Sequence, residues 1–137
     1  MSIAKYYCLE CKGTGATEHG FMDCVPCHGL GIVPDPFAVL VLEQQEFSEK
    51  TFGPGKRTLG MIDHIMKELA EIRDNPDDLT EYIDVMLLAI DGYWRHGGKS
   101  DELWPRLRAK LAKNKARKWP APKDENSAVE HDRQEEA

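Results

Sequence analysis

The sequence predicts an all-α fold of four helices, preceded by a small module rich in glycine and cysteine. Apolar residues recur at helical spacing in several stretches that follow residue 36. Gly-Pro-Gly at 53–55, Asn-Pro at 75–76 and Gly-Gly at 97–98 separate these stretches, and such residues commonly end helices. Residues 1–34 lack this periodicity and contain all four cysteines.

The first helix is expected at residues 37–52 and the second at residues 58–73. The apolar face of the first consists of Phe37, Leu40, Val41, Gln44 and Phe47. The apolar face of the second consists of Ile62, Ile65, Leu69 and Ile72. The turn formed by residues 75–78 then provides a cap for a third helix.

The third helix, at residues 79–95, is apolar around nearly its whole circumference, so we expect it to be buried on most sides. The fourth follows at residues 100–118, with Ser100 as its N-cap. The chain therefore divides into three parts. They are a module at 1–34, a helical domain at 37–122 and an acidic tail at 123–137 that we expect to be disordered.

Composition and charge limit the classes of function. The 137 residues carry a net charge of −6, but residues 35–98 carry −7, from 13 acidic and 6 basic side chains, and residues 99–118 carry +6, from 8 basic and 2 acidic. This charge distribution is not that of a general nucleic-acid binder, which would be basic overall or over one whole face, so we expect no nucleic-acid partner. The chain also lacks an apolar run that could span a membrane and a secretory signal, so we expect a cytoplasmic protein without a membrane partner.

Two Cys-x-x-Cys pairs, separated by twelve residues, predict a structural zinc site. Four thiolates complete a tetrahedral shell, so the ion would be held by Cys8, Cys11, Cys24 and Cys27. Each pair belongs to a repeated Cys-x-x-Cys-x-Gly-x-Gly, which resembles the repeats of DnaJ-type zinc fingers. Buried or redox-active thiols are the alternative. A closed Cys₄ site stabilises a short segment and does no chemistry.

Acidic residues on the second and third helices suggest a second metal site. Glu68 and Glu71 stand at i and i+3, side by side on one helix face. Glu81, Asp84 and Asp91 fall in a stripe about 80° wide on the otherwise apolar third helix. Carboxylates beside buried apolar surface need cations, and oxygen ligands alone favour Mg²⁺ or Mn²⁺. Spacing alone leaves a solvated acidic face equally open, and Asp78-x-x-Glu81 also reads as a capping box.

The paired motifs resemble a known family. Glu68-x-x-Glu71 followed by Glu81-x-x-Asp84 resembles the signature of the MazG-like all-α nucleoside triphosphate pyrophosphohydrolases. The segments Phe52-Gly-Pro-Gly-Lys-Arg-Thr-Leu-Gly, Leu79-x-Glu-Tyr-Ile-Asp-Val and Lys113-Asn-Lys-Ala-Arg117-Lys-Trp-Pro are similar to the phage dATP/dGTP pyrophosphohydrolase family, which includes MazZ-like enzymes. The resemblance covers residues 37–122 and implies a four-helix MazG-like bundle. One departure is Lys67, where the wider superfamily has a glutamate; Asp91 is a candidate to replace it.

The resemblance implies a hydrolase acting on an acid anhydride, which converts a purine deoxynucleoside triphosphate, dGTP or dATP, to the monophosphate and pyrophosphate. It implies that Mg²⁺ or Mn²⁺ is held by Glu68, Glu71, Glu81 and Asp84, with Glu68 or Glu71 as the general base. It further implies a homo-oligomer, a dimer or tetramer, located in the host cytoplasm if the protein is phage-encoded. The alternative function is a non-enzymatic zinc-finger and helical module that binds a protein or nucleic acid.

The basic fourth helix is the expected partner of the substrate phosphates. The family resemblance nominates Lys110, Lys113, Asn114 and Arg117, and Lys56 after the Gly-Pro-Gly turn is a further candidate. Each of these side chains also suits a solvated basic face. Base recognition needs an apolar slot with one or two polar groups. His64 is a candidate there, as are Trp94 and Trp119, although ordinary packing also explains each of them.

Overall fold

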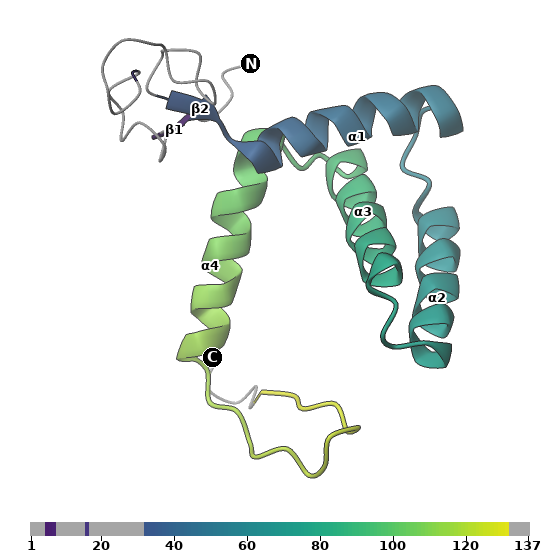
Figure 1. The fold of residues 1–137 in the computed structure, drawn as a ribbon, viewed down its shortest axis with the longest axis vertical. Coiled ribbons are helices and arrows are strands. Elements are labelled where there is room, and N and C mark those ends of the chain that lie inside the picture. Colours follow the sequence, from purple (N-terminus) through teal and green to yellow (C-terminus); the bar gives the residue numbers. More distant parts are fainter. Residues whose placement is uncertain (1–4, 8–15, 17–31, 132–137) are drawn as a thin grey trace. The chain divides into compact units, whose positions relative to one another are not determined.

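The computed structural model describes residues 5–7, 16 and 32–131, and Figure 1 shows the arrangement of its elements. Two short strands, β1 (Lys5–Tyr7) and β2 (Ile32–Pro34), precede helices α1 (Pro36–Phe52), α2 (Thr58–Asp74) and α3 (Leu79–Arg95). A 3-10 helix, η2 (Ser100–Glu102), leads into α4 (Leu103–Ala116). The chain forms two compact units, at 1–103 and 104–137. The expectation of an all-α domain with four helices is confirmed for the part of the chain that the structure describes.

Helix α1 begins and ends where local chemistry requires. The Asp35 carboxylate accepts a hydrogen bond of 2.9 Å from the Phe37 backbone N–H, and Pro36 occupies the first helical position, where no N–H is needed. Gly53 ends the helix with φ at 78°, in the left-handed region that glycine adopts without a Cβ clash. The predicted range of residues 37–52 therefore differs from the observed one by a single residue.

Helices α2 and α3 form a hairpin whose members lie side by side (Figure 1). Asp78 caps α3, because its carboxylate accepts a hydrogen bond of 3.0 Å from the Thr80 N–H. The N–H of Asp78 itself donates to the Asn75 carbonyl oxygen at 3.1 Å. That N–H is the group that a capping box would assign to Glu81. The Glu81 carboxylate is therefore available for another role.

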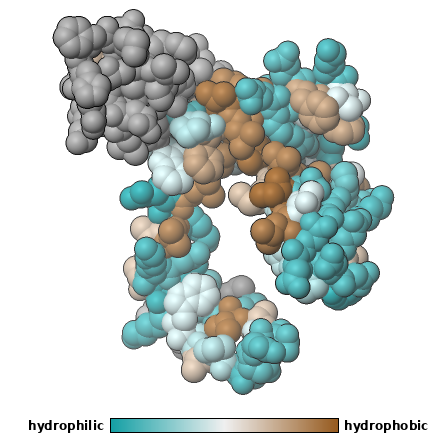
Figure 2. Space-filling view, in the orientation of Figure 1, coloured by the Kyte–Doolittle hydropathy of each residue, from teal (hydrophilic) through white to brown (hydrophobic). Residues whose placement is uncertain are grey.

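The core of the first unit is small and lies between α1, the C-terminal half of α3 and the start of α4. Val41, Ile90 and Leu103 are buried there, with Phe37 and Trp94 packed against them. In the view of Figure 2, hydrophobic surface lies over the N-terminal half of α1 and along α3, whereas the visible face of α2 is hydrophilic. The buried residues Val41 and Ile90 thus place the core of this unit where α1 meets α3.

Two expectations for the helices are wrong. Ser100 is not an N-cap but the first residue of η2, and it is buried because η2 packs against α1. Within the single chain, helix α3 is not buried on most sides, since Leu79, Ile83 and Met86 are more than half exposed. The reason for the second difference is that α2 covers one side of α3, while α1 contacts its C-terminal half. The apolar circumference of α3 therefore exceeds what one chain covers.

In the second unit, α4 ends earlier than expected, at Ala116. After it, the Trp119 indole N–H donates to the Asn114 carbonyl oxygen at 2.7 Å, and Arg117 donates to the Asn114 side chain at 3.0 Å. The Asp124 carboxylate accepts hydrogen bonds from Asn126 and Ser127, which form a turn in the otherwise irregular segment that follows. No helix in the described residues is long and apolar enough to cross a membrane.

The predicted zinc ligands lie outside the described residues. Strands β1 and β2 flank the segment that contains them and pair antiparallel, with Tyr7 opposite Ile32 and Lys5 opposite Pro34. The two ends of the cysteine-containing segment are therefore adjacent.

Candidate active site

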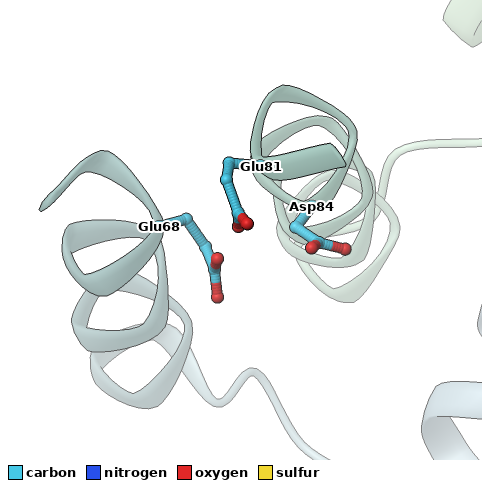
Figure 3. A group of neighbouring side chains, drawn as sticks. All are labelled: Glu68, Glu81 and Asp84. Atoms are coloured by element: carbon cyan, nitrogen blue, oxygen red, sulfur yellow. The ribbon is translucent and has the colours of Figure 1, made fainter. Parts of the chain in front are cut away.

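Three carboxylates from two helices meet between α2 and α3. Glu68 extends from α2, and Glu81 and Asp84 extend from α3 into the same space (Figure 3). One oxygen of each carboxylate lies within 4.8 Å of the others. Glu68 is only 8% exposed, and the other two are half-buried. The hairpin explains the convergence, because residues 81 and 84 share one face of α3 and that face is turned toward Glu68.

The electrostatics of this group favour a cation. Partial removal from water, a hydrogen bond shared with Glu68, and repulsion from Glu71, Asp78 and Glu68 together raise the pKa of Glu81 above its ordinary value. The crowding of negative charge thus opposes full ionisation in the absence of a counterion. Three carboxylates with only oxygen donors suit Mg²⁺ or Mn²⁺, so the residues present are chemically appropriate for the metal that the sequence predicts.

The structure places the other predicted metal ligands differently. Glu71 is exposed and outside the group of three, although its charge acts on Glu81. Asp91 is buried and paired with Arg95, whose Nε donates to both carboxylate oxygens at 3.0 and 2.9 Å. Asp91 also accepts hydrogen bonds from the Ser48 hydroxyl and the Gln44 amide. Asp91 therefore already has a cationic partner, Arg95, within the chain.

Arg95 links this network to the turn after α1. Its side chain is 1% exposed. Its Nη1 donates to the carbonyl oxygens of Gly53 and Gly55 at 3.1 and 2.7 Å, and its Nη2 donates to Ser48 at 2.7 Å. The guanidinium also lies 4.5 Å from the Trp94 ring centroid. Arg95 therefore fixes the Gly-Pro-Gly turn against α3. Sequence reasoning missed it, although the i, i+4 spacing from Asp91 was a usable signal.

A pocket of about 340 Å³ adjoins the carboxylates. Two members of the group, Glu68 and Asp84, belong to its lining, together with residues that are mostly apolar. The full lining is Gln44, Phe47, Phe52, Arg57, Gly60, Met61, His64, Glu68, Asp84, Leu87, Leu88 and Asp91. A concave, mainly apolar space with a few converging polar groups is typical of a small-molecule site.

Besides its carboxylates, the pocket wall contains two further titratable side chains, His64 and Arg57. The His64 Nε2 lies 2.8 Å from the Glu68 carboxylate, so this candidate base-binding residue contacts a metal-ligand candidate. Arg57, which the sequence analysis did not select, lines the pocket, whereas its neighbour Lys56 does not. Arg57 adopts φ 50°, an uncommon conformation for a residue with a side chain, and its Nη1 donates to the Phe52 carbonyl oxygen at 2.9 Å.

The remaining phosphate-binding candidates, Lys110, Lys113, Asn114 and Arg117, belong to the second unit. Lys110 and Lys113 are exposed, and Asn114 is half-buried as the partner of Arg117. Of the two candidate tryptophans, Trp94 packs against the core and Trp119 is exposed in the second unit. The structure therefore brings together three of the four predicted carboxylates and His64, and the basic residues of α4 belong to the second unit.

Comparison with known proteins identifies the family. Residues 40–137 match the sequence profile of dATP/dGTP pyrophosphohydrolases. The chain belongs to the dATP/dGTP pyrophosphohydrolase family. The family match includes α2, α3 and the three carboxylates, and it continues to the last residue. The expectation from the sequence that the chain is a nucleotide pyrophosphohydrolase is therefore confirmed at the level of the family.

A solved structure supports the same family. A MazG-like pyrophosphohydrolase of cyanophage S-2L, bound to dGDP and three catalytic Mn²⁺ ions per active site, matches with a TM-score of 0.54 and 28% sequence identity. The match covers 72% of this chain and 98% of that one. Comparison with curated proteins gave no match.

Proposed function

We propose that the protein hydrolyses a purine deoxynucleoside triphosphate, dGTP or dATP, to the monophosphate and pyrophosphate, in a reaction that requires Mg²⁺ or Mn²⁺. The observation that carries the proposal is the group formed by Glu68, Glu81 and Asp84 at a mainly apolar pocket. The pocket offers a place for a base, and the carboxylates offer a place for a metal-bound triphosphate. The match to an enzyme that binds dGDP and Mn²⁺ supports the same assignment.

Each residue has a distinct part in the proposed reaction. Glu68, Glu81 and Asp84 hold the metal, with Glu71 close enough to add negative charge. When bound there, a divalent cation would neutralise the phosphates and lower the pKa of an attacking water. Glu68 or Glu71 takes the proton from that water. His64, at 2.8 Å from Glu68, holds its carboxylate in place.

Cationic side chains complete the phosphate site in this proposal. Arg57 lies on the pocket wall and provides a charge from within the first unit. Lys110, Lys113, Asn114 and Arg117 remain the proposed phosphate contacts of α4, on the strength of the family resemblance. Lys56 is a weaker choice than Arg57, because it is outside the pocket lining.

The test is a comparison of metal-dependent pyrophosphate release by matched variants. Glu68→Gln and Asp84→Asn keep the size of each side chain and remove one negative charge from the metal group. We expect each to reduce kcat/KM for dGTP by about a hundredfold or more, as is usual when a catalytic charge interaction is lost. Asp63→Asn removes an exposed charge from α2, the helix that carries Glu68. It is the control and should change kcat/KM little. Full activity in both site variants would contradict the proposal.

The non-enzymatic alternative, a zinc-finger and helical module that binds a protein or nucleic acid, is not favoured by the comparisons. It predicts no turnover of any deoxynucleoside triphosphate by the wild-type protein. The same assay therefore distinguishes the two functions.

We also propose that the protein is a homo-oligomer, a dimer or tetramer. Leu59, Ile62, Met66 and Leu69 recur every three or four residues on α2, and all are substantially exposed in the single chain. Leu79, Ile83 and Met86 repeat this pattern on α3. A soluble chain rarely leaves so much apolar surface uncovered. Met66→Lys should lower the mass measured by light scattering, whereas Asp63→Lys on the same helix should not.

We also propose the zinc module, on the basis of the cysteine pattern in the sequence. Cys8, Cys11, Cys24 and Cys27 would hold one Zn²⁺, and the pairing of Tyr7 with Ile32 at the ends of that segment agrees with a closed module. Metal analysis after purification without a chelator should find about one zinc per chain for a single Cys₄ site. A value near zero would contradict it.

A further inference from the structure

Gln44 on α1 is the only amide side chain in the lining of the pocket. The same lining includes Phe47, Phe52 and Met61, apolar side chains that suit the flat face of a nucleobase. Phe47 and Phe52 pack edge to face, with ring centroids 6.0 Å apart. A polar group in a mainly apolar pocket can discriminate between ligands of similar shape by the hydrogen bond that it makes with them.

The two ends of the Gln44 amide have different, fixed partners. The Trp94 indole N–H donates to the Gln44 Oε1. The Gln44 Nε2 donates to the Asp91 Oδ1 at 3.2 Å. An indole nitrogen can only donate, and a carboxylate held by Arg95 can only accept. A rotated amide would place donor against donor at Trp94 and acceptor against acceptor at Asp91. The orientation of Gln44 is therefore determined by its partners, which removes the usual ambiguity of an amide.

The partners are themselves held in place. Asp91 accepts hydrogen bonds from Ser48 and from Arg95 in addition to Gln44. Trp94 stacks on the Arg95 guanidinium and packs against the hydrophobic core. Movement of the amide would disturb this whole network, so Gln44 presents a preorganised group to the pocket.

One hydrogen of the Gln44 NH₂ group is left for a ligand. An amide nitrogen carries two hydrogens, and Asp91 receives one of them. No second acceptor for Nε2 occurs among the residues that the structure describes. Nε2 thus keeps one of its two hydrogens, and Gln44 can offer the pocket a hydrogen-bond donor.

We propose that Gln44, oriented by Trp94 and Asp91, donates a hydrogen bond to the carbonyl oxygen at position 6 of the purine and so selects guanine over adenine. Guanine presents an acceptor at this position and adenine an amino donor. With adenine in the same place, two donors face each other and the Gln44 N–H loses its bond with water without replacement. This inference rests on the proposed function, because it concerns the base of the same substrate.

A series of nucleotides separates this carbonyl from the other features of guanine. dITP has the 6-carbonyl without the 2-amino group, and 2-amino-dATP has the 2-amino group with a 6-amino group. For the wild-type protein we expect dGTP and dITP to share a high kcat/KM. We expect dATP and 2-amino-dATP to be lower by about tenfold to a hundredfold, the effect of leaving one buried donor unpaired. A low value for dITP would overturn the proposal, since recognition would then depend on the 2-amino group.

Gln44→Met removes the donor and keeps the length of the side chain. The ratio of kcat/KM for dGTP to that for dATP should fall to near one. Trp94→Phe is a second variant that keeps an aromatic ring and removes one of the two partners that orient the amide, so it should reduce the same ratio. Gln45→Met is the matched control on the same helix, outside the pocket lining, and should leave the ratio unchanged.

The outcomes distinguish this inference from the proposed function. If the wild-type protein hydrolyses both purine nucleotides and Gln44→Met keeps the wild-type ratio, only the role of Gln44 is overturned. If no nucleotide is hydrolysed, the proposed function fails, and calorimetry with dGDP and dADP then tests Gln44 by binding alone. Tighter binding of dGDP by the wild-type protein, lost in Gln44→Met, would support the inference; equal affinities would overturn it.

Discussion

Replacing Arg95 with methionine should lower the free energy of unfolding substantially, because Arg95 holds the residues around the site together. The guanidinium makes five hydrogen-bond contacts, to both oxygens of Asp91, to Ser48 and to two backbone carbonyls of the Gly-Pro-Gly turn. Methionine fills a similar volume but leaves the buried Asp91 carboxylate with hydrogen bonds only from Ser48 and Gln44. Removing one partner of a buried pair typically costs about 3–5 kcal/mol. That is a large part of the total stability of about 5–15 kcal/mol that is usual for a domain.

Urea unfolding at one fixed protein concentration measures this loss, because an oligomer would otherwise change its apparent stability with concentration. Arg73→Met, at an exposed position on α2, is the control and should stay within about 0.5 kcal/mol of the wild type. The double variant Arg95→Met with Asp91→Asn should recover part of the loss, since the unpaired charge is gone. A loss below about 1 kcal/mol for Arg95→Met, or strictly additive effects in the double variant, would refute the reasoning.

Three further predictions concern single positions. Because the pKa of Glu81 is raised, the metal-free folded state binds the Glu81 proton more tightly than the unfolded state does. Proton binding at Glu81 therefore stabilises the fold at low pH, and this stabilisation is lost as the pH rises through the raised pKa. Glu81→Gln should therefore be more stable than the wild type at neutral pH in EDTA but not at pH 4, as thermal unfolding at each pH would reveal; equal differences at both would contradict this. Arg57→Gly should be more stable than Arg57→Ala by about 1 kcal/mol in urea, because only glycine tolerates φ 50° without strain; the reverse order would be inconsistent with this backbone. Gly60→Ala, with open space around it, should raise stability in the same assay by up to about 1 kcal/mol, whereas Gly92→Ala should gain less, because its Cβ would lie 2.2 Å from the Met61 sulfur and the Met61 side chain must shift; equal changes at both positions would contradict this.

The helix boundaries were predictable because local chemistry determines them. Asp35 and Asp78 cap α1 and α3, and Gly53 ends α1 with a positive φ. These signals are contained within a few residues of sequence. Ser100 has the same chemistry as a good N-cap, but its burial against α1 favoured a 3-10 turn first. That contact is tertiary, and residues far away in sequence produce it.

The site was predictable in part. Helical spacing places Glu81 and Asp84 on one face, and the hairpin then brings Glu68 to them. Spacing alone could not separate Asp91 from this stripe, because its partner depends on the packing of α1 against α3. The role of Gln44 was invisible for the same reason: on the helical wheel it belongs to the apolar face, and only the positions of Trp94 and Asp91 reveal how its amide is oriented.

The most direct test of the central claim is the identity of the products. The wild-type protein is incubated with dGTP and Mn²⁺, and the nucleotide and phosphate products are separated and quantified at early times. The carboxylate group at the pocket predicts dGMP and pyrophosphate in equal amounts, without dGDP, and no reaction in EDTA. Accumulation of dGDP with orthophosphate, or metal-independent turnover, would contradict the account.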